Sequence, residues 1–468
     1  MAFTEFYVTK TSANNLYGGS SEALIDNPGD VTAVHDGAGS HTLTDNGVDG
    51  FSNTSVDDFI CWDTAGAAEY ARVTAVTSSD IIVVLNMVGA VAFTGLENKA
   101  VNVGGCWATV GHATTTVTPS FVNAAGDVPR MNVKYSATAY NEYITCHTDF
   151  TTAIPGTLEG YYSTPGDDCM NGGVWTPPEI SGVGQSGAAI IYSNGGAFWR
   201  IRNLWLHGNV AGDHGIYFFN GATGWLVDRC KIDMTGATGT VYGVYSSYYW
   251  SLIRNCYIVG CATHGVRQAG RGNHVEGCYI KDAGVNGIYM GGVYVQSAIG
   301  NIIDSPGDDG IYVSGAYAGN IRNNVVYNST AGSGIRLGDL SNVYGGSISN
   351  NLCVGNNQYG IELDDAFHYG ANYNAYYNNG VAEVLNVPAR GPDEVTLTGD
   401  PFTNAAGGDF SLNNTAGAGA ACRNAGFPGA MIDGTNEGFA DIGALRHEDP
   451  AGGGGLAKLV GFGGGLVG

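Results

Sequence analysis

The segment Ile253–Val266 reads IRNCYIVGCATHGV, and Val275–Ile288 reads VEGCYIKDAGVNGI, so the same alternation of apolar and polar residues returns after 22 residues. Self-similarity at a period of this size is typical of a solenoid. When the repeats are aligned on the central residue, one column of equivalent positions is Leu204, Cys230, Cys256, Cys278, Asn301, Asn324, Asn351 and Asn374. A second column contains only glycine: Gly215, Gly243, Gly265, Gly287, Gly310, Gly334 and Gly360.

The repeated segments have the pattern of short β-strands. They alternate apolar with polar residues and favour Val, Ile and Tyr. A leucine framework, as in leucine-rich repeats, and a 3.6-residue helical period are both missing from them. The sequence therefore predicts an all-β fold, a single-stranded parallel β-helix in which the strands of each coil pair with those of the coils above and below.

One position in each repeat predicts a sharp corner. Ile253 is out of phase with Cys256 and Ile258, although all three are expected to face inward, so the chain has to bend between Ile253 and Cys256. Gly and Asn tolerate the left-handed backbone of such a bend best. They occupy six of the eight equivalent positions, which are Asn203, Arg229, Asn255, Gly277, Gly300, Asn323, Asn350 and Tyr373.

Stacked coils place equivalent side chains in ladders. Cys256 above Cys278 predicts an interior thiol ladder, and Asn301 to Asn374 predict an amide ladder in which each side chain bonds the next. The ten cysteines form no CxxC pair and no HxxxH motif accompanies them, so we interpret them as apolar core residues rather than as a zinc site or a disulfide framework.

Composition limits the classes of partner. The formal net charge of −23 disfavours binding to nucleic acid or to anionic lipid. No apolar run is long enough to span a membrane, and the N-terminal MAFTEFYVTK has no pattern of a secretory signal. With 44% hydrophobic residues the chain has ample material for a core, which excludes disorder.

At this point the chain resembles the right-handed parallel β-helix proteins of the pectate-lyase-like superfamily, including tailspike and other virion-associated members of bacteriophages. The resemblance covers about residues 130–390; LEGYYSTPGDD (158–168) is similar to an early coil, and 399–447 to a C-terminal closing segment. We expect five parts: an opening segment at 1–21, a small β insertion at 22–103 for attachment, the β-helix at 104–390, a capping segment at 391–447 and a flexible Gly-rich tail at 448–468.

The first candidate site is a column of outward residues that follow the column glycines. Tyrosine rings stack on sugar rings, and arginine bonds hydroxyls or carboxylates. The alternative is that these side chains stack on one another and stiffen the sheet. The candidate glycan-binding residues are Tyr217, Tyr245, Arg267, Tyr289, Tyr312 and Arg336, with Glu362 next in the column.

The second candidate site is acidic and falls on three successive coils. Paired carboxylates suit glycoside hydrolysis. The same oxygen ligands suit Ca²⁺, which is the one possible cofactor. The alternative to both is that these residues form acidic turns in solvent. Polygalacturonase-like proteins also carry Gly-His-Gly and Arg-Ile-Lys motifs, which this chain lacks, and Arg267 with Arg271 lacks the context of a pectate-lyase base. The candidate catalytic residues are Asp308, Asp309, Asp339, Glu362, Asp364 and Asp365.

Three functions follow as hypotheses. The first is a structural protein of a bacteriophage virion, such as a tailspike, fibre or capsid-attached protein, located in the virion or outside the cell. Its expected partners are two further copies of itself in a trimer, other virion or surface proteins and a cell-surface polysaccharide. The second is a polysaccharide lyase or glycoside hydrolase. The third is a bacterial surface or filament protein without enzymatic activity.

Overall fold

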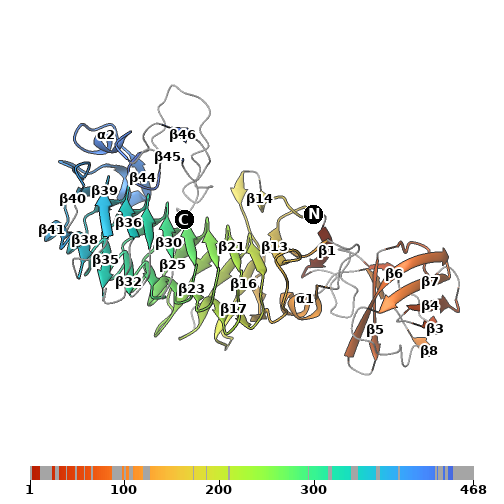
Figure 1. Ribbon diagram of the computed structural model, residues 1–468. Helices are drawn as coiled ribbons and strands as arrows, with labels where there is room; N and C mark the ends of the chain where they lie inside the picture. Colours follow the sequence, from red (N-terminus) through yellow and green to blue (C-terminus); the bar gives the residue numbers. More distant parts are fainter. Residues whose placement is uncertain are drawn as a thin grey trace. The chain divides into compact units, whose positions relative to one another are not determined.

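The computed structural model divides into two compact units, which are described separately (Figure 1). The first contains 1–172, 176–180 and 196–204, and the second contains 173–175, 181–195 and 205–468. The structure describes residues 3–10, 24–26, 31–37, 40–47, 50–56, 58–64, 67–86, 97–99, 102–104, 109–119, 127–171, 173–185, 187–208, 211–292, 295–314, 319–338, 346–364, 369–387, 391–426, 429–430, 436–437 and 441–445.

The first unit begins with a parallel ladder of strands from distant parts of the chain. β1 (Phe3–Val8) pairs with β10 (Val128–Lys134), which pairs with β13 (Gly156–Tyr161), which pairs with β18 (Trp199–Arg202). Helix α1 (Val110–Thr116) precedes β10, and the Glu142 carboxylate accepts the N–H groups of Val110 and Gly111 at its first turn. This unit also contains the short strands β11 (Tyr140–Asn141), β12 (Ile144–Thr145), β14 (Met170–Asn171) and most of β16 (Glu179–Ser181). The strand β15 (Val174–Trp175) belongs to the second unit.

An antiparallel sheet lies between β1 and β10 in the sequence. Its strand order is β2-β9-β5-β6-β7-β4-β3-β8, and its core includes Val31, Leu43, Ile60, Val73 and Val84. The strands are β2 (Leu24–Asp26), β3 (Val31–Gly37), β4 (Ser40–Asp45), β5 (Phe59–Thr64), β6 (Ala67–Ser78), β7 (Ile81–Asn86), β8 (Glu97–Lys99) and β9 (Asn102–Gly104).

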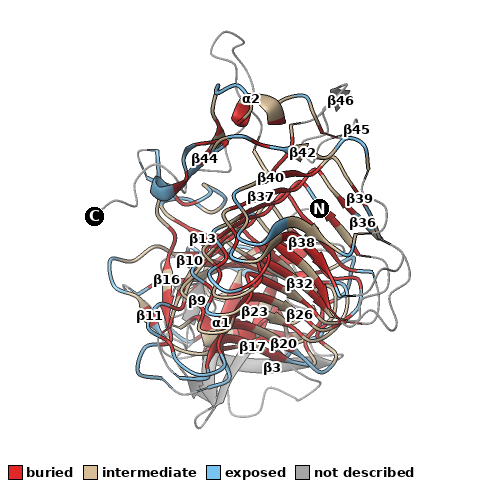
Figure 2. Cartoon of the chain, turned by 90° about the vertical axis from the view of Figure 1, so that its left-hand side faces the viewer, coloured by how far each residue is buried: buried red, intermediate tan, exposed pale blue. Residues whose placement is uncertain are grey.

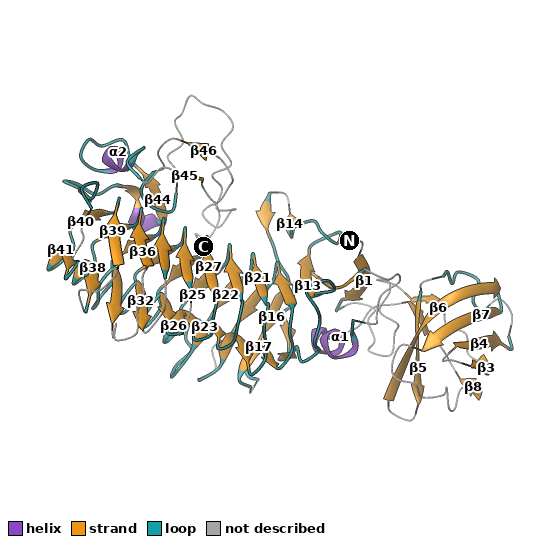
Figure 3. Ribbon diagram, in the orientation of Figure 1, coloured by secondary structure: helices purple, strands orange, loops and turns teal. Residues whose placement is uncertain are grey.

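The second unit is a parallel β-helix, as predicted: strands and loops make up nearly all of it (Figure 3). One ladder contains β21 (Leu226–Asp228), β24 (Leu252–Arg254), β27 (His274–Glu276), β30 (Ser297–Ile299), β33 (Asn320–Arg322), β36 (Gly346–Ser349) and β39 (Tyr369–Asn372). Another contains β19 (Trp205–His207), β22 (Lys231–Asp233), β25 (Tyr257–Val259), β28 (Tyr279–Lys281), β31 (Ile302–Asp304), β34 (Val325–Tyr327), β37 (Leu352–Val354), β40 (Ala375–Tyr377) and β42 (Val395–Thr396). The third contains β17 (Ala189–Asn194), β20 (His214–Phe219), β23 (Tyr242–Ser246), β26 (His264–Gln268), β29 (Ile288–Met290), β32 (Ile311–Ser314), β35 (Ile335–Gly338), β38 (Tyr359–Leu363) and β41 (Ala382–Leu385).

The predicted corner is left-handed at all eight positions. The φ angles from Asn203 to Tyr373 lie between 52° and 66°, including those of Arg229 and Tyr373, the two residues that are neither Asn nor Gly. A second left-handed corner, which the sequence analysis did not identify, follows the next strand of each coil. It contains Gly260, Asp282, Ser305, Asn328, Gly355 and Asn378, with φ between 51° and 69°.

The two interior ladders are present. The nine cysteines of the described part are all buried and free, and burial raises the pKa of the Cys256 thiol well above its ordinary value. In the amide ladder, Asn301 Nδ2 donates to Asn324 Oδ1 at 3.0 Å, and Asn324 donates to Asn351, and Asn351 to Asn374, at 2.9 Å. Asn374 donates to Glu394 Oε1 at 2.8 Å, so the ladder ends on a carboxylate.

The column of glycines occupies positions where adjacent coils come too close for a side chain. A Cβ on Gly287 would lie 2.7 Å from the carbonyl oxygen of Gly310 and 2.3 Å from Cγ2 of Ile303. At Gly265 the corresponding distance to the carbonyl oxygen of Gly287 is also 2.7 Å. Glycine is therefore needed here for close approach of the backbones.

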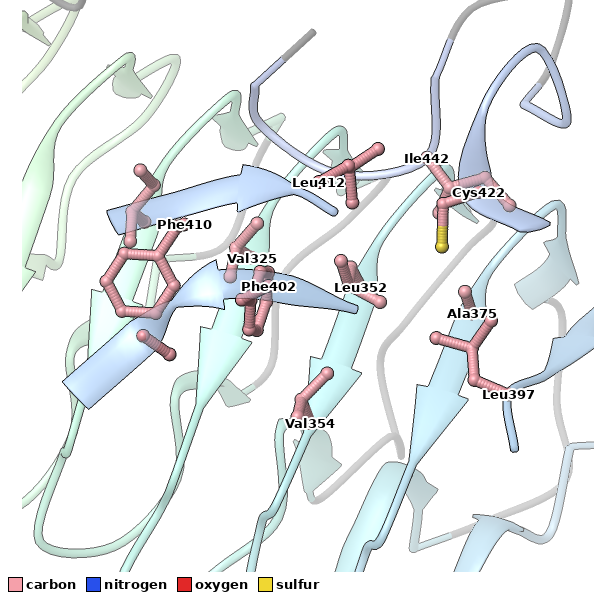
Figure 4. Packing of buried hydrophobic residues seen from close by; sticks show 12 residues of the cluster. Val325, Leu352, Val354, Ala375, Leu397, Phe402, Phe410, Leu412, Cys422 and Ile442 are labelled. Carbon is pink, nitrogen blue, oxygen red and sulfur yellow. The ribbon is translucent and has the colours of Figure 1, made fainter. Parts of the chain in front are cut away.

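The residues that follow the last coils pack against the side of the second ladder. The side chains of β43 (Phe402–Asn404) and β44 (Asp409–Leu412) cover Val325 and Leu352 (Figure 4). The remaining elements are a 3-10 turn (Ala405–Gly407), α2 (Gly419–Cys422), β45 (Gly429–Ala430) and β46 (Asn436–Glu437). The predicted Gly-rich tail lies outside the described residues, and no described helix is long and apolar enough to cross a membrane.

Candidate functional site

The strands of the third ladder carry buried residues that alternate with outward ones, which Figure 2 shows as red beside tan. Their registers place the predicted glycan-binding residues directly above one another. We define the tyrosine–arginine column as this set, one residue from each of six successive strands: Tyr217, Tyr245, Arg267, Tyr289, Tyr312 and Arg336. Each of the six is half-buried.

The members of the column contact one another in sequence. The rings of Tyr217 and Tyr245 are stacked, with centroids 4.6 Å apart and planes 5° from parallel. The Arg267 guanidinium lies 4.8 Å from the Tyr245 ring centroid and 5.5 Å from that of Tyr289. Tyr289 and Tyr312 follow at 5.5 Å. The column is thus a continuous surface of rings and guanidinium groups, packed as the stacking alternative anticipated.

A second row of rings lies beside the column and was missed by the sequence analysis. His214 is 4.6 Å from Tyr242, Tyr242 is 5.4 Å from His264, and His264 is 5.0 Å from Tyr289 of the column. The signal was available, because both histidines directly precede a glycine of the column. Tyr242 directly precedes Gly243, so it takes the same position in the coil between them.

Both histidines are neutral at neutral pH. Burial, together with the charge of Arg267, lowers the pKa of His214 and of His264 to about 4. The Nδ1 atoms accept backbone N–H groups from Tyr242 and Asn286, both at 3.3 Å, which leaves the ring proton on Nε2. Arg267 is therefore the charged group of this part of the face.

Arg267 makes few polar contacts for a guanidinium. Its Nη1 donates to the Tyr242 hydroxyl at 2.6 Å, whereas its buried Nε has no hydrogen-bond partner, and no described carboxylate forms an ion pair with it. By contrast, Nη2 of Arg336, in the same column, lies 3.2 Å from Asp364 Oδ2. A guanidinium without a carboxylate partner retains donors for a ligand.

Three of the acidic candidates, Asp309, Glu362 and Asp364, are linked through other side chains. The Asp309 carboxylate accepts the N–H of Ser333 at 2.7 Å, and the Ser333 hydroxyl donates to Glu362 Oε2 at 2.6 Å, so one serine connects two carboxylates from different coils. Arg336 connects Glu362 to Asp364, since its Nε lies 3.7 Å from Glu362 Oε1 and its Nη2 lies 3.2 Å from Asp364 Oδ2. Asp308 precedes Asp309 in the sequence, and its Oδ1 lies 2.6 Å from the position that a Cβ on Gly332 would take. Two further candidates, Asp339 and Asp365, lie outside the described residues.

Asp309 has an unusual proton affinity. Burial raises its pKa to about 7. The nearby charges of Asp308 and Glu362 also raise this pKa, whereas the hydrogen bond from Ser333 lowers it. Asp309 is only 2% exposed and Glu362 only 7%. Within the described part of the chain, no three His, Cys, Asp or Glu side chains gather as a metal site would require.

Comparison with known proteins agrees with the fold. Residues 242–387 match the family model described as a right handed beta helix region, and the protein has this right-handed fold. No curated protein matches the chain.

Similar solved structures include an alginate lyase from a Paenibacillus strain, with 16% identity, a TM-score of 0.45 and coverage of 60% of this chain and 96% of that one. The pectate lyase Pel9A is 12% identical, with a TM-score of 0.44 and coverage of 73% and 92%. Tailspike protein 2 from a bacteriophage of Escherichia coli O157:H7 is 13% identical, with a TM-score of 0.42 and coverage of 74% and 49%.

Proposed function

We propose that this protein is a non-catalytic polysaccharide-binding β-helix whose binding surface is the tyrosine–arginine column. The observation that carries the proposal is the unbroken series of rings and guanidinium groups on six successive strands. The half-buried rings contact one another through their faces, so their edges and hydroxyl groups are left to contact a sugar. Arg267 adds hydrogen-bond donors that no described carboxylate occupies. Strands spaced about 4.8 Å apart repeat these groups along one direction, which suits a linear polymer.

Binding is tested with polygalacturonate, alginate and dextran, measured by affinity electrophoresis and calorimetry with Tyr245→Ala and Arg267→Gln. We expect each substitution to weaken binding of a recognised polysaccharide by about tenfold, the effect of losing one aromatic or charged contact. Tyr257→Ala is the matched control, because Tyr257 is a half-buried tyrosine in a different ladder, on β25. Equal loss in the control, or none in the two column variants, contradicts the proposal.

A more specific part of the proposal is that the protein belongs to a bacteriophage virion, where it binds a cell-surface polysaccharide and assembles as a homotrimer. The antiparallel sheet between β1 and β10, with a core of its own, supports this role as a candidate attachment domain. Light scattering gives the molar mass, and a monomer at micromolar concentration contradicts the trimer. Mass spectrometry and electron microscopy of the native source distinguish virus particles from the alternative, a filament on the bacterial surface.

Polysaccharide cleavage is the second candidate function. It is favoured by the pKa of about 7 at Asp309, which suits a general acid, and by the connection of Asp309 to Glu362 through Ser333. We place it second because both carboxylates are nearly inaccessible. New reducing ends or unsaturated products from a bound polysaccharide, lost in Asp309→Ala and Asp364→Ala, would support cleavage over binding alone.

A further inference from the structure

Trp250 combines exposure with a backbone conformation that its residue type disfavours. Its side chain is 66% exposed, the largest value among the exposed large hydrophobic residues of the described part. Its φ is +60°, in the left-handed region. This conformation costs a residue with a Cβ roughly 1–2 kcal/mol relative to the usual helical or extended one. An exposed side chain recovers little of that cost through burial.

The two neighbouring coils place glycine at the same position. The registers Leu226 to Leu252 and Leu252 to His274 make Gly224, Trp250 and Gly272 equivalent, two residues before the strand in each coil. All three have positive φ: 69° at Gly224, 60° at Trp250 and 63° at Gly272. The corner therefore requires a left-handed residue in every one of these coils, and only the middle one has a large side chain.

Gly272 also makes room for the indole. A Cβ on Gly272 would lie 2.4 Å from two carbons of the Trp250 ring. The ring therefore packs against the backbone of the next coil, and any residue with a side chain at position 272 would displace it. One side of the ring is thus supported by the protein, and the high exposure of the residue leaves the rest of the indole accessible to solvent.

The turn that carries the ring is held by both adjacent coils. The N–H of Trp250 donates to the Arg271 carbonyl at 2.8 Å, and the N–H of Gly224 donates to the Tyr249 carbonyl at 3.1 Å. The Thr223 hydroxyl donates to the same carbonyl at 2.9 Å. Tyr249 is stacked on Tyr248, and the Arg271 guanidinium lies 5.4 Å from its ring centroid. The platform is preorganised, which lowers the entropy lost when a ligand binds.

We propose that Trp250 is a second glycan-binding position, a flat platform on which a pyranose ring of the bound polysaccharide stacks. The inference depends on the proposed polysaccharide-binding function and adds a position outside the tyrosine–arginine column. Trp250 differs from left-handed corner residues such as Arg229 and Tyr373 because its large side chain is exposed. A strained conformation kept without burial of the side chain suits a functional position. A sugar ring suits this platform because it presents an apolar face to the indole.

The decisive variant is Trp250→Gly, because it restores the residue found in both neighbouring coils. If the indole serves binding, this variant has an unchanged or higher thermal midpoint and about tenfold weaker binding of the polysaccharide recognised by the wild type. If the indole serves the fold, the thermal midpoint falls. Such a fall overturns the inference.

Tryptophan fluorescence supplies a direct reading. The recognised polysaccharide is expected to protect wild-type fluorescence from acrylamide quenching, and Trp250→Gly is expected to lose that protection. Undiminished binding by Trp250→Gly, with weakened binding by Arg267→Gln, overturns the platform and leaves the column as the binding site. Absence of binding to any of the three polysaccharides by the wild type overturns both proposals. A lower molar mass of Trp250→Gly identifies the indole as a contact between copies and also overturns the inference.

Discussion

Asparagine occupies two adjacent positions in several coils, and the two side chains act differently. Asn323 is at the corner, with φ of 58°, and Asn324 beside it belongs to the amide ladder. The first position selects Asn for its tolerance of left-handed backbone. The second position selects Asn because its amide donates and accepts hydrogen bonds at once, so that each side-chain amide bonds the amide of the next coil. Both roles were predicted from the sequence.

Asn324→Ala is predicted to destabilise the protein by about 2–4 kcal/mol, because it leaves several buried groups without partners. Asn324 Oδ1 accepts the backbone N–H and the Nδ2 of Asn301, and its own Nδ2 donates to the Ala298 carbonyl at 2.9 Å. Urea unfolding measures the change. Asn357→Ala is the control, since Asn357 is exposed and its side chain donates a long hydrogen bond of 3.4 Å to the Ala331 carbonyl. Equal effects would show that the ladder adds nothing.

Asp309 is predicted to make stability depend on pH. Because its folded pKa is raised to about 7, the folded chain keeps a proton that the unfolded chain has released. The contribution of this proton to folding stability is complete below about pH 4, the ordinary pKa of an aspartate, and it is lost as the pH rises through 7. The thermal midpoint of Asp309→Asn, compared with wild type from pH 4 to 8, is expected to be less sensitive to pH. The exposed control Asp409→Asn should follow the wild-type profile; a parallel profile for Asp309→Asn contradicts the assignment.

At the scale of the element, each coil has a position where no side chain fits, and glycine occupies it. The third ladder begins each strand near a glycine whose Cα meets the backbone of the next coil, and this close contact brings the outward side chains of the column into stacking distance. The sequence predicted the existence of the glycine column and the register of the tyrosines. It did not reveal the reason for the glycines, because the close contact is with a residue of another coil.

Gly287→Ala is predicted to destabilise the protein by about 1–3 kcal/mol or more, as overpacking does in a dense interior. The added methyl would meet the Gly310 carbonyl oxygen at 2.7 Å, which cannot move without separating two strands. Gly370→Ala, in β39, is the matched control because nothing lies within 4 Å of its added methyl. Thermal unfolding of the two variants compares them, and similar midpoints would disprove the proposed backbone contact.

At the scale of the whole molecule, a solenoid exposes apolar surface wherever its coils are not covered. In the second unit, Phe402, Phe410 and Leu412 supply this cover over the β34 and β37 strands (Figure 4). Phe410 is 2% exposed, and its ring lies 5.1 Å from that of Phe402 and 5.5 Å from that of Tyr327. The covering segment comes from a part of the chain with no repeat to align.

Phe410→Asp is predicted to release this cover and promote association, because burying an unpaired carboxylate costs several kcal/mol and the alternative exposes Val325 and Leu352. Increased binding of a hydrophobic dye and a concentration-dependent rise in light scattering are the measurements. Val381→Asp places the same charge at a residue that is 62% exposed and should change neither. A Phe410→Asp protein that stays unassociated and dye-free would exclude the covering role.

The sequence by itself determined the coil: its strands, the first corner, both ladders and the alignment of the column. It could do so because, in a solenoid, residues one period apart in sequence are neighbours in space, so local pattern and tertiary contact coincide. Only the tertiary structure decided two further features: the serine that joins Asp309 to Glu362, and the exposure of Trp250. Turn lengths differ from coil to coil, so no fixed spacing encodes these lateral contacts, and how far each side chain is buried depends on the neighbouring coils.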